Sequence, residues 1–319
     1  MSDRVSLVIA GRGLDLDVGN GIVDGVRAEI PSDYPCDVEV TEWSRQPGSH
    51  YSVRMSSDLV QMLSQQVASG ARAVVVFCGS ATIEEMAYLA GLLWIYPQPL
   101  IFAAMPTTGS PMSESQLAVR DALAIAASHG AWNNGVLVYA DGRIYSAMDV
   151  MLASNMERIR MSGNLCSALG AVVGGEVAFM HKPVLKGRVF NEIVSPAKNV
   201  EMIYATLGGG KVFLQALVDD NKGSVDGLVI AGFGSGSVYP SWVPCIKTLA
   251  FKDVPIVLAS RCLRGNVLDS GDFEGSFLRL KELGIMSGGY LSPLQARLKL
   301  AVGIGAGLRG AALQDYILH

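Results

Sequence analysis

The segment VVVFCGSATIEEMAYLAGLL, residues 74–93, decides the fold of this 319-residue chain. Its opening run of β-branched and aromatic residues predicts a buried parallel strand. A polar loop, residues 79–82, follows, and a helix then begins with one apolar face, formed by Ile83, Met86, Ala87, Ala90 and Leu93. Thr82 and Glu85 predict a capping box at the start of this helix. Open α/β sheets bind ligands where a strand end meets a helix N-terminus, so loop 79–82 is the first candidate site.

The composition predicts two globular domains, because 50% of the residues are hydrophobic and only 17% are charged. A net charge of −4 gives no basic surface for nucleic acid. The five cysteines show no C-x-x-C spacing and the four histidines are dispersed, so we expect no metal, no disulfide and no other cofactor. The apolar start is too short for a signal peptide, and no stretch reaches transmembrane length. We therefore expect a cytoplasmic protein without a membrane partner.

The first half of the chain alternates strands with helices. Apolar runs predict strands at Val5–Ala10, Val38–Trp43, Leu100–Met105 and Gly135–Tyr139. Helical periodicity predicts helices at Ser56–Ser69 and Leu117–Ala127. The first strand runs into Gly11-Arg12-Gly13, but Leu16 stands where a dinucleotide fingerprint needs its third glycine. A dinucleotide site is therefore disfavoured.

A second α/β unit follows a mixed segment with turn signals. Its predicted strands are Val200–Thr206, Val225–Ala231 and Val254–Ser260, and its predicted helices are Lys211–Val218, Ser241–Phe251 and Phe273–Leu283. We predict an N-terminal domain at 1–182, a linker at 183–199 and a smaller C-terminal domain at 200–319.

The segment Gly79-Ser80-Ala81-Thr82-Ile83-Glu84-Glu85 resembles the second motif of the L-asparaginase/glutaminase family, Gly-Thr-Asp-Thr-Met-Glu-Glu. Residues 227–242 and 284–302 resemble two further motifs of that family, in the same order along the chain. The resemblance implies two α/β domains with mostly parallel sheets and an amidohydrolase ancestry. It also implies a homo-oligomer, a dimer or a tetramer.

The resemblance also implies a ligand-binding loop. Gly48 and Ser49 match a pair that holds the α-carboxylate of the substrate in the family, and His50 takes the next position. With Gly79 and Ser80, these residues are the implied binding site for a small amide or amino acid. His50 is either a base that titrates near neutrality or an exposed loop histidine, and the sequence leaves both interpretations open.

The groups that carry the chemistry of the family are replaced here. Gly13 or Leu14 stands in place of the first threonine, Ala81 in place of the aspartate, and Leu152 in place of the lysine. No lysine precedes Lys182, and arginine cannot act as a base because it stays protonated. The tyrosine of the lid has no match at the expected place, since Tyr34 lies later and is better explained as a tyrosine packed on the surface.

Two hypotheses follow. In the first, the chain is a non-catalytic homologue with a binding, assembly or structural role. In the second, it is a divergent amidohydrolase in which Ser80 is the nucleophile and His50 the base, with Asp141 or Asp149 orienting the histidine. Thr82 is a further candidate hydroxyl, although the capping box would account for it.

The C-terminal domain carries the residues that reach a neighbouring subunit in the family. Ser235 and Ser237 replace two asparagines of the family motif, and Glu274 falls where the family places a glutamate. The resemblance assigns these three residues to a subunit interface. A further, unidentified protein partner stays open.

Overall fold

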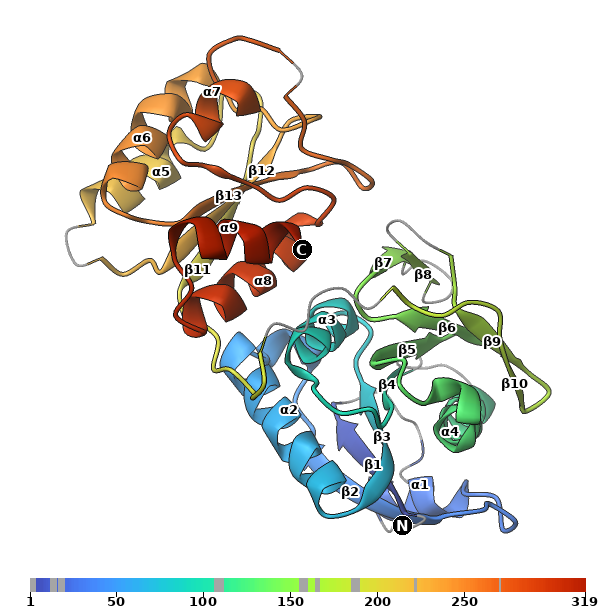
Figure 1. Cartoon of the computed structure of the whole chain (residues 1–319). Coiled ribbons are helices and arrows are strands. Elements are labelled where there is room, and N and C mark those ends of the chain that lie inside the picture. Colours follow the sequence, from blue (N-terminus) through green and yellow to red (C-terminus); the bar gives the residue numbers. More distant parts are fainter. Residues whose placement is uncertain are drawn as a thin grey trace. The chain divides into compact units, whose positions relative to one another are not determined.

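The computed structural model describes residues 4–11, 16, 21–105, 112–154, 160–163, 167–184, 190–220, 223–269 and 271–319. The chain divides into two compact units, Met1–Ile193 and Val194–His319 (Figure 1). This division falls inside the segment predicted as a linker. Both units are α/β with mostly parallel sheets, so the predicted fold class is confirmed.

The first unit is built on an eight-stranded sheet in the order β10-β9-β6-β5-β4-β3-β1-β2. Its parallel strands are β1 (Arg4–Ala10), β2 (Asp37–Ser44), β3 (Ala71–Cys78), β4 (Leu100–Ala104) and β5 (Val136–Ala140). Antiparallel strands extend it: β6 (Arg143–Ser146), β9 (Gly170–Val173) and β10 (Glu176–Phe179). A separate hairpin pairs β7 (Val150–Ser154) with β8 (Arg160–Gly163).

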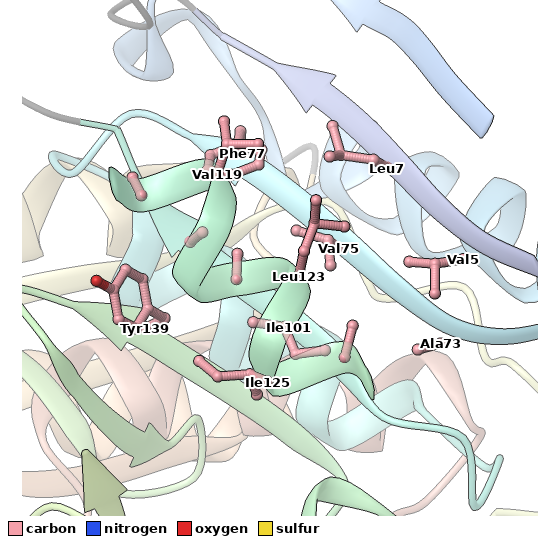
Figure 2. Close-up of a cluster of buried hydrophobic side chains, with 14 of the residues drawn as sticks. Val5, Leu7, Ala73, Val75, Phe77, Ile101, Val119, Leu123, Ile125 and Tyr139 are labelled. Carbon is pink, nitrogen blue, oxygen red and sulfur yellow. The ribbon is translucent and has the colours of Figure 1, made fainter. Parts of the chain in front are cut away.

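Helices cover both faces of this sheet. They are α1 (Ile22–Ala28), α2 (Val53–Ala68), α3 (Ile83–Leu93) and α4 (Met112–Ala127), with the 3₁₀ turns η1 (Gly48–His50) and η2 (His129–Ala131). Residues of α1 and α4 share one core with alternate residues of β1, β3 and β4. In Figure 2, Val119 of α4 lies by Phe77 of β3, and Leu123 of α4 lies by Val75 of β3. Because side chains alternate along a strand, Val74 and Val76 face the other side, where α2 packs against β3 and α3.

The strand order reverses at β1, which pairs with β2 on one side and with β3 on the other. The chain leaves β1 toward β2 and returns to β3, so the carboxyl ends of β1 and β3 form a topological switch point. Ligands of open α/β sheets bind at such points. The fold therefore places the loop after β3, residues 79–82, at the expected ligand position.

The second unit has a parallel four-stranded sheet in the order β11-β12-β13-β14. The strands are β11 (Val200–Tyr204), β12 (Gly227–Gly232), β13 (Ile256–Ser260) and β14 (Met286–Ser287). The helices are α5 (Lys211–Asp219), η3 (Pro240–Trp242), α6 (Val243–Phe251), α7 (Phe277–Lys281), α8 (Pro293–Gly305) and α9 (Gly310–Leu318). Its core centres on Trp242 and Leu258, both fully buried.

Two predicted helices of the second unit begin differently in the structure. The helix predicted at Phe273–Leu283 is confined to α7, because Gly275 has a φ of +86° and the Ser276 hydroxyl caps the helix. The helix predicted from Ser241 begins as the 3₁₀ turn η3. Helix α1 was not predicted from the sequence, because it spans only 7 residues. In the part of the chain that the structure describes, no helix combines the length and apolar character needed to cross a bilayer.

Candidate functional site

Three chain segments meet at the switch point. Gly11 follows β1, Gln46 follows β2 and Gly79 follows β3. A Cβ added to Gly11 would lie 3.3 Å from the Gly79 nitrogen and 3.8 Å from the Gln46 oxygen. The glycine at position 11 therefore allows the three segments to pack backbone to backbone.

The loop after β2 also contacts the start of α3. A Cβ added to Gly48 would lie only 2.5 Å from the Thr82 Oγ1, and one added to Gly79 would lie 3.9 Å from the Gly48 nitrogen. Real side chains do not approach so closely as 2.5 Å, so the Thr82 hydroxyl occupies the space that a side chain at position 48 would need. The structure thus brings together residues of both implied binding loops.

The predicted capping box at Thr82 is wrong. The Thr82 side chain accepts no hydrogen bond from the helix, and its hydroxyl contacts the Met86 Sδ at 3.6 Å instead. The backbone of Thr82, with φ −123° and ψ 3°, departs from the extended conformation in which a cap side chain reaches the first-turn amides. Thr82 therefore belongs to the wall of the site, facing Gly48.

Ser80 lies in the turn that follows Gly79 and is partly exposed, whereas Ser49 and His50 on η1 are exposed. Among the hydrogen bonds of the described residues, none joins the His50 imidazole to the Ser80 hydroxyl. The two residues lie on neighbouring loops without forming a nucleophile–base pair. Gly13 and Leu14, the two alternatives that the resemblance gives for the position of the first threonine, lie outside the described residues.

Glu84 is a site-edge residue that sequence reasoning missed. Its Oε2 accepts a hydrogen bond of 2.8 Å from the backbone nitrogen of Leu152, and this bond holds β7 against the first turn of α3. Burial raises the pKa of Glu84, while the Leu152 amide acts in the opposite direction. The sequence signalled Glu84 only as an acidic residue at a helix start. Position 152, which carries leucine here, thus lies beside the candidate site.

Two tyrosines near these loops in the sequence are partly buried: Tyr34, which the sequence suggested is packed on the surface, and Tyr51, for which it suggested no role. Tyr34 precedes β2 and so lies at the amino edge of the sheet, opposite the candidate site; it packs on the core and donates a hydrogen bond of 2.9 Å to the Leu123 oxygen. Tyr51 follows η1, its ring lies 5.6 Å from that of Trp43, and its hydroxyl oxygen is buried. Burial raises the pKa of both phenols, which therefore stay protonated at neutral pH.

Asp141 and Asp149, the two carboxylates predicted to orient His50, follow β5 and β6, which lie beyond β4 from the candidate site. Asp141 lies in the turn between β5 and β6, with a φ of +47°, and Asp149 lies just before β7. Strand β4 separates β5 from β3. The described residues contain no cluster of three or more histidine, cysteine or acidic side chains suited to a metal ion.

In the second unit, the segments carrying the predicted interface residues lie side by side. Ser235 and Ser237 occupy the turn after β12, and Ser237 forms a bridge with Ser276. Glu274 is exposed and lines an open groove of about 430 Å³ together with Lys247 and Leu280. The turn after β12 and the loop before α7 therefore form one surface.

Comparison with known proteins agrees with this architecture. The family model "Asparaginase, N-terminal" matches residues 18–185, and "Glutaminase/Asparaginase C-terminal domain" matches residues 199–317. The chain belongs to the asparaginase/glutaminase family.

Among its relatives, an L-asparaginase of Bacillus licheniformis is 26% identical over 88% of this chain and 87% of its own length. A probable L-asparaginase of Deinococcus radiodurans is 28% identical over 82% of this chain and 79% of its own length. The crystal structure of a probable cytoplasmic L-asparaginase from Campylobacter jejuni has the same fold, with a TM-score of 0.84 at 23% identity. That comparison covers 100% of this chain and 99% of the other.

Proposed function

We propose that this chain is a non-catalytic member of the asparaginase family that binds a small amide or amino acid between the loops after β2 and β3. One observation carries the proposal. The Ser80 hydroxyl is followed by Ala81, and β7 brings Leu152, rather than a lysine, to the first turn of α3. The hydroxyl thus lacks the aspartate and the lysine that the resemblance to the family would require beside it.

The expected loss in the rate of amide hydrolysis supports this proposal. Removing one member of a catalytic cluster costs on the order of 10³ in rate, and further removals add less because the members act as a unit. We therefore expect asparagine hydrolysis to be at least about 10³-fold slower than in an ordinary enzyme of the family. The packed loops around Gly11, Gly48 and Gly79 persist, which supports a role in binding.

A divergent amidohydrolase is the second candidate, and the position of His50 favours it. His50 lies on η1, two residues after Gly48, which contacts the start of α3. A catalytic hydrogen bond is often absent from an unliganded enzyme and forms only when substrate binds. A Ser80–His50 pair is therefore a concrete alternative in which Ser80 attacks a linear amide.

Ammonia release from asparagine and glutamine, measured for the wild-type protein and for Ser80→Ala, separates the two candidates. The proposal expects background release by both proteins, together with calorimetric binding of an amino acid or amide to each. Turnover that Ser80→Ala and His50→Ala both abolish would establish the hydrolase instead. As a gain-of-function arm, Ala81→Asp combined with Leu152→Lys restores two missing groups, and folding of this variant is checked by circular dichroism.

Self-assembly is the remaining part of the proposal. The exposed Glu274 and the adjoining turn with Ser235 and Ser237 form one surface of the second unit, which supports an interface between copies of the chain. Light scattering on the purified protein tests it. A dimer or tetramer that Glu274→Arg weakens is expected, and a monomer at all concentrations would reject assembly.

A further inference from the structure

A buried acid–phenol pair lies inside the first unit, apart from the candidate site. Asp121 is on α4 and Tyr139 is on β5, and each is only 4% exposed. The Tyr139 hydroxyl donates a hydrogen bond to the Asp121 Oδ2. Figure 2 shows Tyr139 beside α4, at the edge of the apolar cluster that α4 forms with the sheet.

Among the residues that the structure describes, no cation is paired with the Asp121 carboxyl. In the described part of the chain, the hydrogen bond from Tyr139 is the polar contact of the Asp121 carboxyl, and no ion pair includes it. The neighbouring Arg120 is paired with Glu29 on the exposed side of α4. Asp141 in the β5–β6 turn is also negative, and its charge contributes to the raised pKa of the Tyr139 hydroxyl. Burying a carboxylate without a cation is costly, so burial shifts the protonation equilibrium of Asp121 toward the neutral acid.

We propose that the Asp121–Tyr139 pair is a proton-dependent latch that holds α4 on the sheet when Asp121 is protonated and loosens it when Asp121 is ionised. The pair joins α4 to the end of β5, close to the backbone amide of Gly142 in the β5–β6 turn. Helix α4 packs on β3 and β4, and β3 carries the candidate site at its end. The latch therefore acts on the strands that position the site, and it does not depend on whether the site is catalytic.

The sign of the pH dependence follows from the burial. Burial raises the pKa of Asp121 above its ordinary value, while the hydrogen bond from Tyr139 lowers it by a smaller amount. A group with a raised pKa in the folded state contributes stability below its unfolded pKa, and this contribution is lost as the pH rises through the folded pKa. The contribution of Asp121 to stability should thus be complete below about pH 4, the unfolded pKa, and be lost as the pH rises through the raised folded pKa.

Thermal unfolding of the full chain between pH 4 and pH 8 tests the latch. In the wild type, we expect ionisation of this carboxyl to lower Tm by about 3–5 °C for each pKa unit by which burial raises its pKa. Asp121→Asn keeps position 121 neutral at every pH, so it should abolish the part of the Tm–pH slope that Asp121 contributes. Tyr139→Phe removes the donor that favours the carboxylate, so it should move the midpoint of the Tm–pH curve to higher pH. Asp58→Asn, on the exposed face of α2, is the matched control with a wild-type curve.

The proposal is overturned if Asp121→Asn keeps the wild-type slope, or if Tyr139→Phe leaves the midpoint unchanged. If a variant fails to fold, hydrogen exchange measured on the wild-type protein tests the latch in place of that variant. Protection of α4 amides, corrected for intrinsic exchange rates, should fall with rising pH while that of α2 does not, and equal pH dependence of the two helices would reject the latch.

Discussion

At the scale of single residues, the site depends on close approaches that only particular side chains permit. Thr82 carries a hydroxyl that a sequence pattern assigns to helix capping, yet the structure turns this hydroxyl toward Gly48. The pattern gives the residue type but not the side-chain direction. The direction depends on the loop after β2, which lies more than 30 residues earlier in the chain.

This contact gives a sharp prediction for Gly48. Gly48→Ala places a Cβ 2.5 Å from the Thr82 Oγ1, so we expect a loss of about 1–3 kcal/mol in unfolding free energy from overpacking. Thr82→Ala removes the obstructing atom, and the double variant should therefore recover most of the loss. Chemical denaturation measures the unfolding free energies of the wild type, the two single variants and the double variant, which together form a double-mutant cycle.

Thr82→Val provides the control, because valine keeps a heavy atom where the hydroxyl stood. Gly48→Ala combined with Thr82→Val should stay as unstable as Gly48→Ala alone. Recovery by valine as well as by alanine would show that steric contact between positions 48 and 82 is not the cause.

At the scale of elements, the first turn of α3 anchors a distant strand. Glu84 accepts the backbone N–H of Leu152 and so ties β7 to the helix. The sequence predicts the helix well, since α3 begins at the predicted residue and buries the predicted face. It does not predict β7, because that strand belongs to a separate hairpin and its position depends on a contact 68 residues away.

Glu84→Ala should leave the Leu152 amide without its acceptor. We expect this variant to lose about 1–3 kcal/mol of unfolding free energy, since an unpaired buried donor costs that much. Glu84→Gln keeps an acceptor oxygen and should lose less. Hydrogen exchange resolved by residue would show faster exchange at Leu152 in Glu84→Ala, and unchanged exchange there would contradict the anchoring role.

At the scale of the whole molecule, the chain consists of two units with separate cores. Leu7 is fully buried in the first core and Leu258 in the second. Each unit has its own sheet and its own covering helices. The candidate site is built from the first unit, while Ser235, Ser237 and Glu274 belong to the second.

Separate cores predict separable responses to mutation. Leu7→Ala and Leu258→Ala should each cost about 2–5 kcal/mol, because each opens a cavity in a packed core. In differential scanning calorimetry of the full chain, we expect two transitions, one lowered by each variant. A single transition that both variants lower equally would mean that the two units unfold as one.

The sequence by itself determined the alternation of strands and helices, the two α/β units and the loop at residues 79–82, because period-2 and period-3.6 patterns are local. The prediction that reactive groups of the family are replaced also comes from the sequence, because it rests on residue identities and on the resemblance to the family motifs. Only the tertiary structure decided that Gly11, Gly48 and Gly79 meet, that Thr82 faces Gly48, and that Asp121 and Tyr139 share one buried hydrogen bond. These contacts depend on strand order and on the crossovers between strands, which join residues far apart in the chain and leave no periodic signal in it.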